Sequence, residues 1–147
     1  MTQTKHTIKN MNLRTAIKIM LSLIATVTIF HFCIILKIIP YEIAWGGRLK
    51  NDAEMYVFES FSLLINILLI LTLLIKGNFI NQLFSLRVVN IILWFYLILF
   101  GLNTIGNLLA TTNLEKSFAV LTLASTLLIW IIIKGKNRET TTMYKQY

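Results

Sequence analysis

Seven polar residues of this sequence could carry chemistry, because they lie within or beside long apolar runs, where ionisable and amide side chains are rare. They are His31, Glu42, Arg48, Glu59, Asn66, Asn103 and Asn107. An imidazole and a carboxylate can bind protons or cations, and together with an arginine they could serve an acid–base enzyme. The asparagine amides could bind a ligand, or they could join neighbouring helices by hydrogen bonds.

No complete motif of a catalytic or metal centre accompanies these residues. The sequence contains no phosphate-binding loop, no spacing typical of metal ligands and no serine nucleophile elbow. Its single cysteine, Cys33, excludes an internal disulfide and a zinc site built from cysteines. We therefore expect no metal, no cofactor and no catalytic residue, and we favour a protein that is not an enzyme.

The composition is that of a membrane protein. Of the 147 residues, 56% are hydrophobic and only 14% are charged, against roughly 25% charged in a soluble domain. The net charge of +8 could suggest nucleic acid, but the basic residues lie in short segments between apolar runs. Such segments orient membrane proteins, so the expected partner is the lipid bilayer, with no nucleic acid.

Four apolar runs predict four membrane-spanning helices, each near the ~20 residues that cross the hydrocarbon. Pro40 is expected to end the first helix, and Asn51 with Glu54 has the spacing of a capping box that begins the second. Continuous rather than alternating apolar character excludes a β-barrel. The prediction is an all-α polytopic membrane protein in one domain, 1–147. It is an antiparallel bundle of four transmembrane helices at about 17–39, 54–75, 87–110 and 115–133, with an outer loop at 40–56 and tails at 1–16 and 134–147.

The distribution of lysine and arginine predicts that both tails are cytoplasmic. One side of the predicted bundle carries Lys37, Arg48, Lys50 and Lys116. The side with the termini carries Lys5, Lys9, Arg14, Lys18, Lys76, Arg87, Lys134, Lys136, Arg138 and Lys145. The richer side of a multi-pass protein faces the cytoplasm.

Helical spacing suggests how the polar residues of the spans are arranged. Glu59 and Asn66 share one face of the second predicted helix, and Asn103 and Asn107 share one face of the third. They could converge with His31 on a polar pocket beneath the outer loop. The alternative is that the amides only join helices and that His31 is a packed, hydrogen-bonded imidazole. We predict that Glu59 faces the bundle interior and has a cationic or hydrogen-bonding partner, with Lys37 or Arg48 as the expected one.

The outer loop and the two halves of the chain give two further patterns. Trp45 precedes Gly46-Gly47 and is expected in an aromatic belt at the membrane surface, with a binding turn as the alternative. Leu-Arg opens the first and third predicted helices, and Lys-Gly closes the second and fourth. This could record a duplicated helical hairpin, or only the usual starts and stops of membrane spans.

Residues 41–49, Tyr-Glu-Ile-Ala-Trp-Gly-Gly-Arg-Leu, and 55–59, Met-Tyr-Val-Phe-Glu, carry a resemblance. There the chain resembles uncharacterised small bacterial four-span membrane proteins. The resemblance covers most of the chain and implies the bacterial cytoplasmic (inner) membrane. It supplies no activity and no site residues.

Three functional hypotheses remain open. The first is a non-enzymatic integral membrane protein that acts through partner or small-ligand contacts at the outer loop and the outer half of the bundle. The partner would be a second copy, as in a homo-oligomer, or another membrane protein. The second is a small transporter or channel subunit that works as an oligomer, with His31 and Glu59 as proton or cation groups. The third is a membrane-embedded enzyme that uses His31, Glu42, Arg48 and Glu59.

The predicted orientation can be tested by cysteine labelling in intact cells. In a Cys33→Ser background, Lys50→Cys should react with a membrane-impermeant maleimide, because it lies in the outer loop. Asn137→Cys should react only after the cells are broken. Labelling of Asn137→Cys in intact cells would reverse the orientation.

Overall fold

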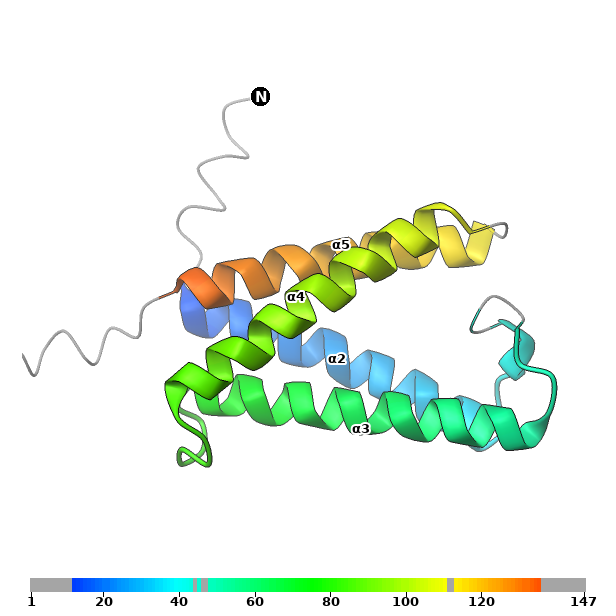
Figure 1. The fold of residues 1–147 in the computed structure, drawn as a ribbon, viewed down its shortest axis with the longest axis horizontal. Coiled ribbons are helices and arrows are strands. Elements are labelled where there is room, and N and C mark those ends of the chain that lie inside the picture. Colours follow the sequence, from blue (N-terminus) through cyan, green and yellow to red (C-terminus); the bar gives the residue numbers. More distant parts are fainter. Residues whose placement is uncertain (1–11, 44, 46–47, 111–112, 136–147) are drawn as a thin grey trace, which may run out of the picture.

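The computed structural model describes residues 12–43, 45, 48–110 and 113–135. Within these residues the chain forms four long helices and one short 3-10 helix, and no strand (Figure 1). They are α2 (Leu13–Ile35), η1 (Tyr41–Ile43), α3 (Asp52–Lys76), α4 (Leu86–Leu108) and α5 (Asn113–Lys134). The four long helices are each long and apolar enough to cross a membrane, so the all-α, four-helix prediction is confirmed.

Successive long helices run antiparallel and pack in the ring α2–α3–α4–α5, with α5 returning to α2. Figure 1 shows the start of α2, the end of α5 and the 77–85 connection at one end of the bundle, here called the termini end. The connections after α2 and after α4 lie at the opposite end, here called the loop end.

The first helix lies four residues earlier than predicted, at Leu13–Ile35 rather than 17–39. The helix begins at Leu13 because its first turns are buried in the bundle, at Leu13, Ala16 and Ile17. Its end is set by Lys37, which adopts a left-handed conformation with φ 56°. The Lys37 amide donates to Ile34 (2.8 Å) and the Ile38 amide to Cys33 (2.9 Å), which is a Schellman motif. The chain therefore leaves the helix before Pro40 is reached.

Both ends of α3 follow the sequence signals. The Asn51 side chain accepts from the Glu54 amide at 2.9 Å, and the Glu54 carboxylate accepts from the Lys50 amide at 2.9 Å. This confirms the predicted cap, although the return bond reaches the residue before Asn51. At the other end Asn78 has φ 54°, and the Phe79 amide donates to Leu74 at 2.9 Å, so a second Schellman motif ends α3 after Lys76.

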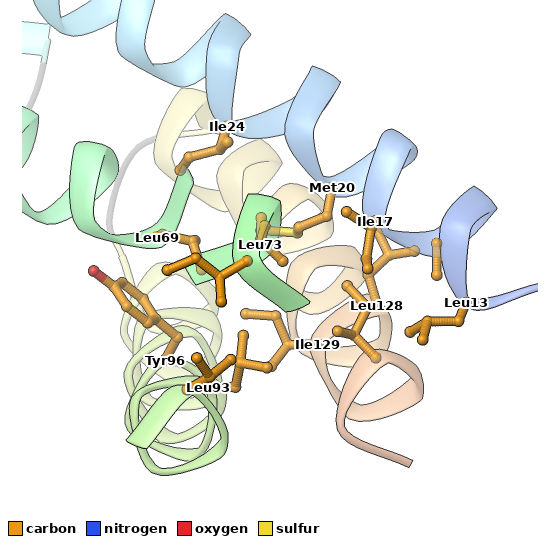
Figure 2. Packing of buried hydrophobic residues seen from close by; sticks show 14 residues of the cluster. Leu13, Ile17, Met20, Ile24, Leu69, Leu73, Leu93, Tyr96, Leu128 and Ile129 are labelled. Atoms are coloured by element: carbon orange, nitrogen blue, oxygen red, sulfur yellow. The ribbon is translucent and has the colours of Figure 1, made fainter. Parts of the chain in front are cut away.

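The main hydrophobic core lies in the half of the bundle nearer the termini end and includes side chains from all four long helices (Figure 2). Its buried members are Leu13, Ala16, Ile17, Met20, Ile24, Leu69, Leu73, Ile75, Val89, Leu93, Tyr96, Leu128, Ile129 and Ile132. The loop end has only a small second cluster, Ile34, Leu49 and Met55. Because α4 and α5 contribute no buried member to it, the α2–α3 and α4–α5 hairpins are packed together mainly at the termini end, and they diverge toward the loop end (Figure 1).

The motifs that suggested a duplicated hairpin fall at helix ends. Leu13 and Leu86 begin α2 and α4, and Lys76 and Lys134 end α3 and α5. Ordinary membrane spans with the same directions would place such residues in the same way, so the duplication stays a prediction.

The core predicts a large difference between two leucines of α3. Leu73 is fully buried in the main core, whereas Leu64 is 63% exposed. Leu73→Ala should lower the free energy of unfolding by about 2–5 kcal/mol, the usual cost of such a cavity, and Leu64→Ala by much less. Unfolding of the purified protein from mild detergent into SDS measures both. Equal losses for the two variants would contradict the packing described.

Candidate functional site

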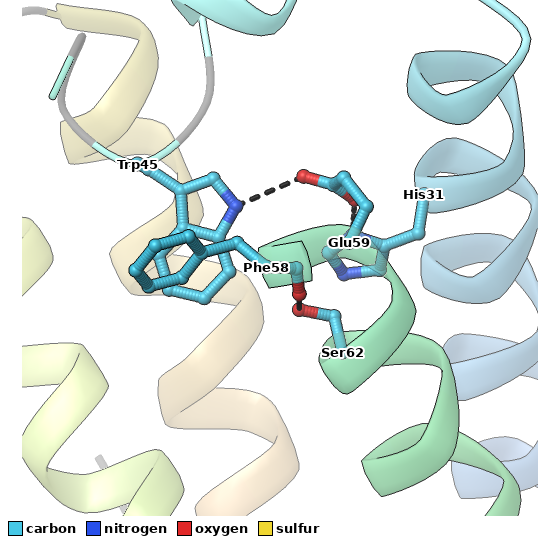
Figure 3. A network of polar contacts seen from close by, with 5 residues as sticks. All are labelled: His31, Trp45, Phe58, Glu59 and Ser62. Atoms are coloured by element: carbon cyan, nitrogen blue, oxygen red, sulfur yellow. Dashed lines mark hydrogen bonds and ion pairs between the residues drawn. The ribbon is translucent and has the colours of Figure 1, made fainter. Parts of the chain in front are cut away.

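The polar cluster at the loop end is built around the Glu59 carboxylate, which is 0% exposed. Its Oε2 lies 2.5 Å from Nδ1 of His31, and its Oε1 accepts a hydrogen bond from Nε1 of Trp45 at 2.9 Å (Figure 3). An ionised carboxylate can only accept, so His31 donates through Nδ1. The cluster thus joins α2, α3 and the connection between them.

Helical periodicity places both ionisable residues on inward faces. His31 lies seven residues after Ile24 and three before Ile34, and both isoleucines are buried. Glu59 lies four residues after the buried Met55 and seven before Asn66, which is 7% exposed. These spacings return to one face of a helix. The prediction that Glu59 faces the bundle interior and has a hydrogen-bonding partner is therefore confirmed.

Trp45 enters the cluster from the loop rather than from a helix. Its backbone is left-handed, with φ 56°, a conformation that costs an ordinary residue about 1–2 kcal/mol. Its ring packs against Phe58 with centroids 5.1 Å apart, and the residue remains 41% exposed (Figure 3). Trp45 is thus partly exposed, as expected for a residue of an aromatic belt, but its indole N–H donates to Glu59.

The prediction that Lys37 or Arg48 is the partner of Glu59 was wrong. Because α2 ends early, Lys37 lies beyond the helix and binds Asp52 at 2.5 Å, at the start of α3. This hydrogen bond raises the pKa of Lys37 above its ordinary value. Arg48 is exposed and, within the described residues, makes no ion pair with Glu59.

The other predicted site residues do not join the cluster by any hydrogen bond between described residues. Glu42 and Asn103 are exposed and Asn107 is half-buried. Asn66 is buried, and its Nδ2 has no hydrogen-bond partner among the described residues. The structure therefore brings His31 and Glu59 together and adds Trp45, while the wider outer pocket stays a prediction.

Two hydrogen bonds elsewhere in the bundle show what other polar side chains do. Thr104 on α4 donates to Thr122 on α5 at 2.9 Å, so this threonine pair joins two helices, as polar side chains in spans often do. The Tyr96 hydroxyl donates to the Ile65 carbonyl at 2.6 Å and ties α4 to α3. Sequence reasoning missed Tyr96 and the role of Trp45. The sequence offered one signal for Trp45. It is the tryptophan in the polar loop that precedes the helix of Glu59, a carboxylate that was predicted to face inward.

Comparisons with known proteins leave the site to be interpreted from its geometry. No protein-family model, no curated protein and no solved structure matches the chain.

The chemistry available to the cluster is limited and specific. Among the described residues no group of three His, Cys, Asp or Glu could hold a metal ion, and Glu59 is the only buried acid. An acid–base pair of two carboxylates is therefore not assembled there. The cluster can bind a proton or a cation at Glu59, and it connects the position of the loop to the ends of α2 and α3.

Substitution of His31 tests how much the hydrogen bond from α2 to Glu59 contributes to the stability of the protein. His31→Gln should fold with nearly unchanged stability, because an amide can still donate to Glu59. His31→Leu removes the donor and should lower the free energy of unfolding by about 1.5–3 kcal/mol, the range for hydrogen bonds to charged groups. SDS unfolding measures both variants. If leucine were tolerated as well as glutamine, the His31–Glu59 contact would contribute no stability.

Proposed function

We propose that this chain is a non-enzymatic, multi-pass protein of the bacterial cytoplasmic membrane, with both termini in the cytoplasm. In this proposal it acts by binding a small ligand or a partner at its outer face. The binding surface consists of the described residues of the connection, 36–43, 45 and 48–51, and the loop ends of α2 and α3. The partner, where it is a protein, is a second copy of the chain or another membrane protein.

One observation carries the proposal: a buried carboxylate fastens a surface loop to two membrane helices. Glu59 is bound by His31 from α2 and by Trp45 from the loop. A carboxylate in an apolar setting is costly unless it is fully paired, and ionisable residues within spans are most often functional. Whatever binds the loop is thereby coupled to the helices through a single group.

The two alternatives have less support. A transport pathway needs polar groups along the whole bundle, but the half nearer the termini end is filled by the apolar main core. An enzyme that uses His31, Glu42, Arg48 and Glu59 needs these groups together, but Glu42 and Arg48 are exposed and share no hydrogen bond with Glu59 among the described residues.

Photo-crosslinking tests the proposal. The photoreactive residue p-benzoylphenylalanine would replace Glu42 in the outer loop, or the matched exposed residue Leu83 in the 77–85 connection. After irradiation of intact cells, intact-protein mass spectrometry should show one discrete added mass from position 42. Position 83 should give none or only lipid adducts.

The same spectra separate the kinds of partner. An added mass equal to the chain itself identifies a second copy, and a small added mass identifies a ligand. No adduct at position 42, or the same adducts at both positions, would contradict binding at the outer face.

A further inference from the structure

Among the residues that the structure describes, Glu59 has no partner that carries a permanent positive charge. It is the only acid that is buried among the described residues, and its one ion-pair partner there is His31, which is charged only when protonated. Lys37 is engaged by Asp52, which is itself exposed. The desolvation of a buried carboxylate is repaid by an opposite charge that is held in good hydrogen-bond geometry. The group that would complement this carboxylate is therefore a cation.

The described surroundings of Glu59 do not form a calcium or magnesium site, and they favour an organic cation. Calcium and magnesium require about six or more oxygen ligands, whereas no group of metal ligands is assembled among the described residues. What does surround the carboxylate is aromatic. The Trp45 and Phe58 rings pack against each other beside it (Figure 3). The Phe30 ring lies edge-on to His31, with the two ring centroids 6.0 Å apart. Aromatic faces attract ammonium groups and their apolar substituents.

The two oxygens of Glu59 differ in how easily their donors can be replaced. Oε2 is held by His31 on the α2 helix, while Oε1 is held by Trp45 on a loop in a left-handed backbone conformation. Trp45 is 41% exposed, so the residue that donates to Oε1 can itself be reached from the surroundings. An N–H donor from outside can take its place without moving a helix.

We propose that Glu59 is the binding site for an organic ammonium group, which replaces the Trp45 indole N–H at Oε1 and lies against the Trp45 and Phe58 rings. The inference rests on the proposed function and names its ligand class. The ammonium group belongs to a free amine or to an aminolipid headgroup such as that of phosphatidylethanolamine. Its positive charge neutralises Glu59, and its N–H group keeps Oε1 hydrogen-bonded.

Trp45 fluorescence in the full chain tests this. Trp94→Phe and Trp130→Phe leave Trp45 as the single reporter, and the protein is placed in phosphatidylglycerol nanodiscs. Benzylammonium should shift Trp45 emission to the red with saturation, because the indole moves toward water. Benzyl alcohol and benzoate have the same ring without the positive charge and should give no saturable shift.

Two carboxylate variants locate the site. Glu59→Gln should weaken the benzylammonium response at least tenfold, and the matched loop variant Glu42→Gln should respond like the parent. Circular dichroism checks that each variant is folded, and the three probes need no change at Glu59. Equal responses to benzylammonium and benzyl alcohol overturn the inference, as does an unchanged response in folded Glu59→Gln.

Nanodiscs that contain phosphatidylethanolamine distinguish the two sources of the ammonium group. A red shift in these discs without any probe identifies the lipid headgroup, and a shift only with benzylammonium identifies a free amine. A discrete adduct at position 42 without a charge-selective response overturns the ammonium site alone. A charge-selective response without any adduct overturns only the proposed binding in cells.

Discussion

Hydrocarbon offers no hydrogen bonds to a polypeptide, and this constraint accounts for most of the architecture. Each long segment must satisfy its own backbone, so the apolar runs become helices. The backbone groups at the helix ends then need local partners, which the Schellman motifs after α2 and α3 and the Asn51 cap provide. The same constraint applies to side chains, because an unpaired polar group in a span is costly. Among the described residues, Glu59, Tyr96 and Thr104 satisfy it by hydrogen bonds to other helices or to the loop.

The two ends of the bundle are consequently held together in different ways. At the termini end an apolar core joins all four long helices. At the loop end the buried apolar cluster joins only α2, α3 and their connection. Polar contacts carry more of the cohesion there: His31 to Glu59 within one hairpin and Thr104 to Thr122 within the other. Hydrogen bonds between helices in membranes contribute about 0.6 kcal/mol on average, and one to a charged group about 1.5–3 kcal/mol. A single buried core leucine contributes about 2–5 kcal/mol, so the loop end is the half that can rearrange at lower cost.

The sequence predicts those features that repeat over many residues and misses those that depend on one residue's conformation. Apolar runs were enough for four spans, and helical spacing was enough to turn Glu59 inward. The end of α2 was wrong because it depends on the left-handed Lys37, and lysine carries no sequence signal for that conformation, unlike the Asn78 that ends α3. The same error assigned Lys37 to Glu59 rather than to Asp52. Trp45 and Tyr96 were missed because their hydrogen bonds reach partners 14 and 31 residues away, across contacts that no local pattern encodes.

Glu59 links the loop to the bundle more strongly than any other polar contact of the loop that the structure describes. The other ion pair, between Lys37 and Asp52, is exposed on both sides, and exposed pairs contribute little because water and salt screen them. The turn bonds from Ile43 to Pro40 and from Arg48 to Trp45 are both long, at 3.4 Å. The Trp45–Glu59 bond is instead shielded from water at the carboxylate, where a hydrogen bond to a charge is at its strongest. A change of hydrogen-bond partner at Oε1 therefore acts first on the loop, and it reaches the helices through Glu59 itself on α3 and through His31 on α2.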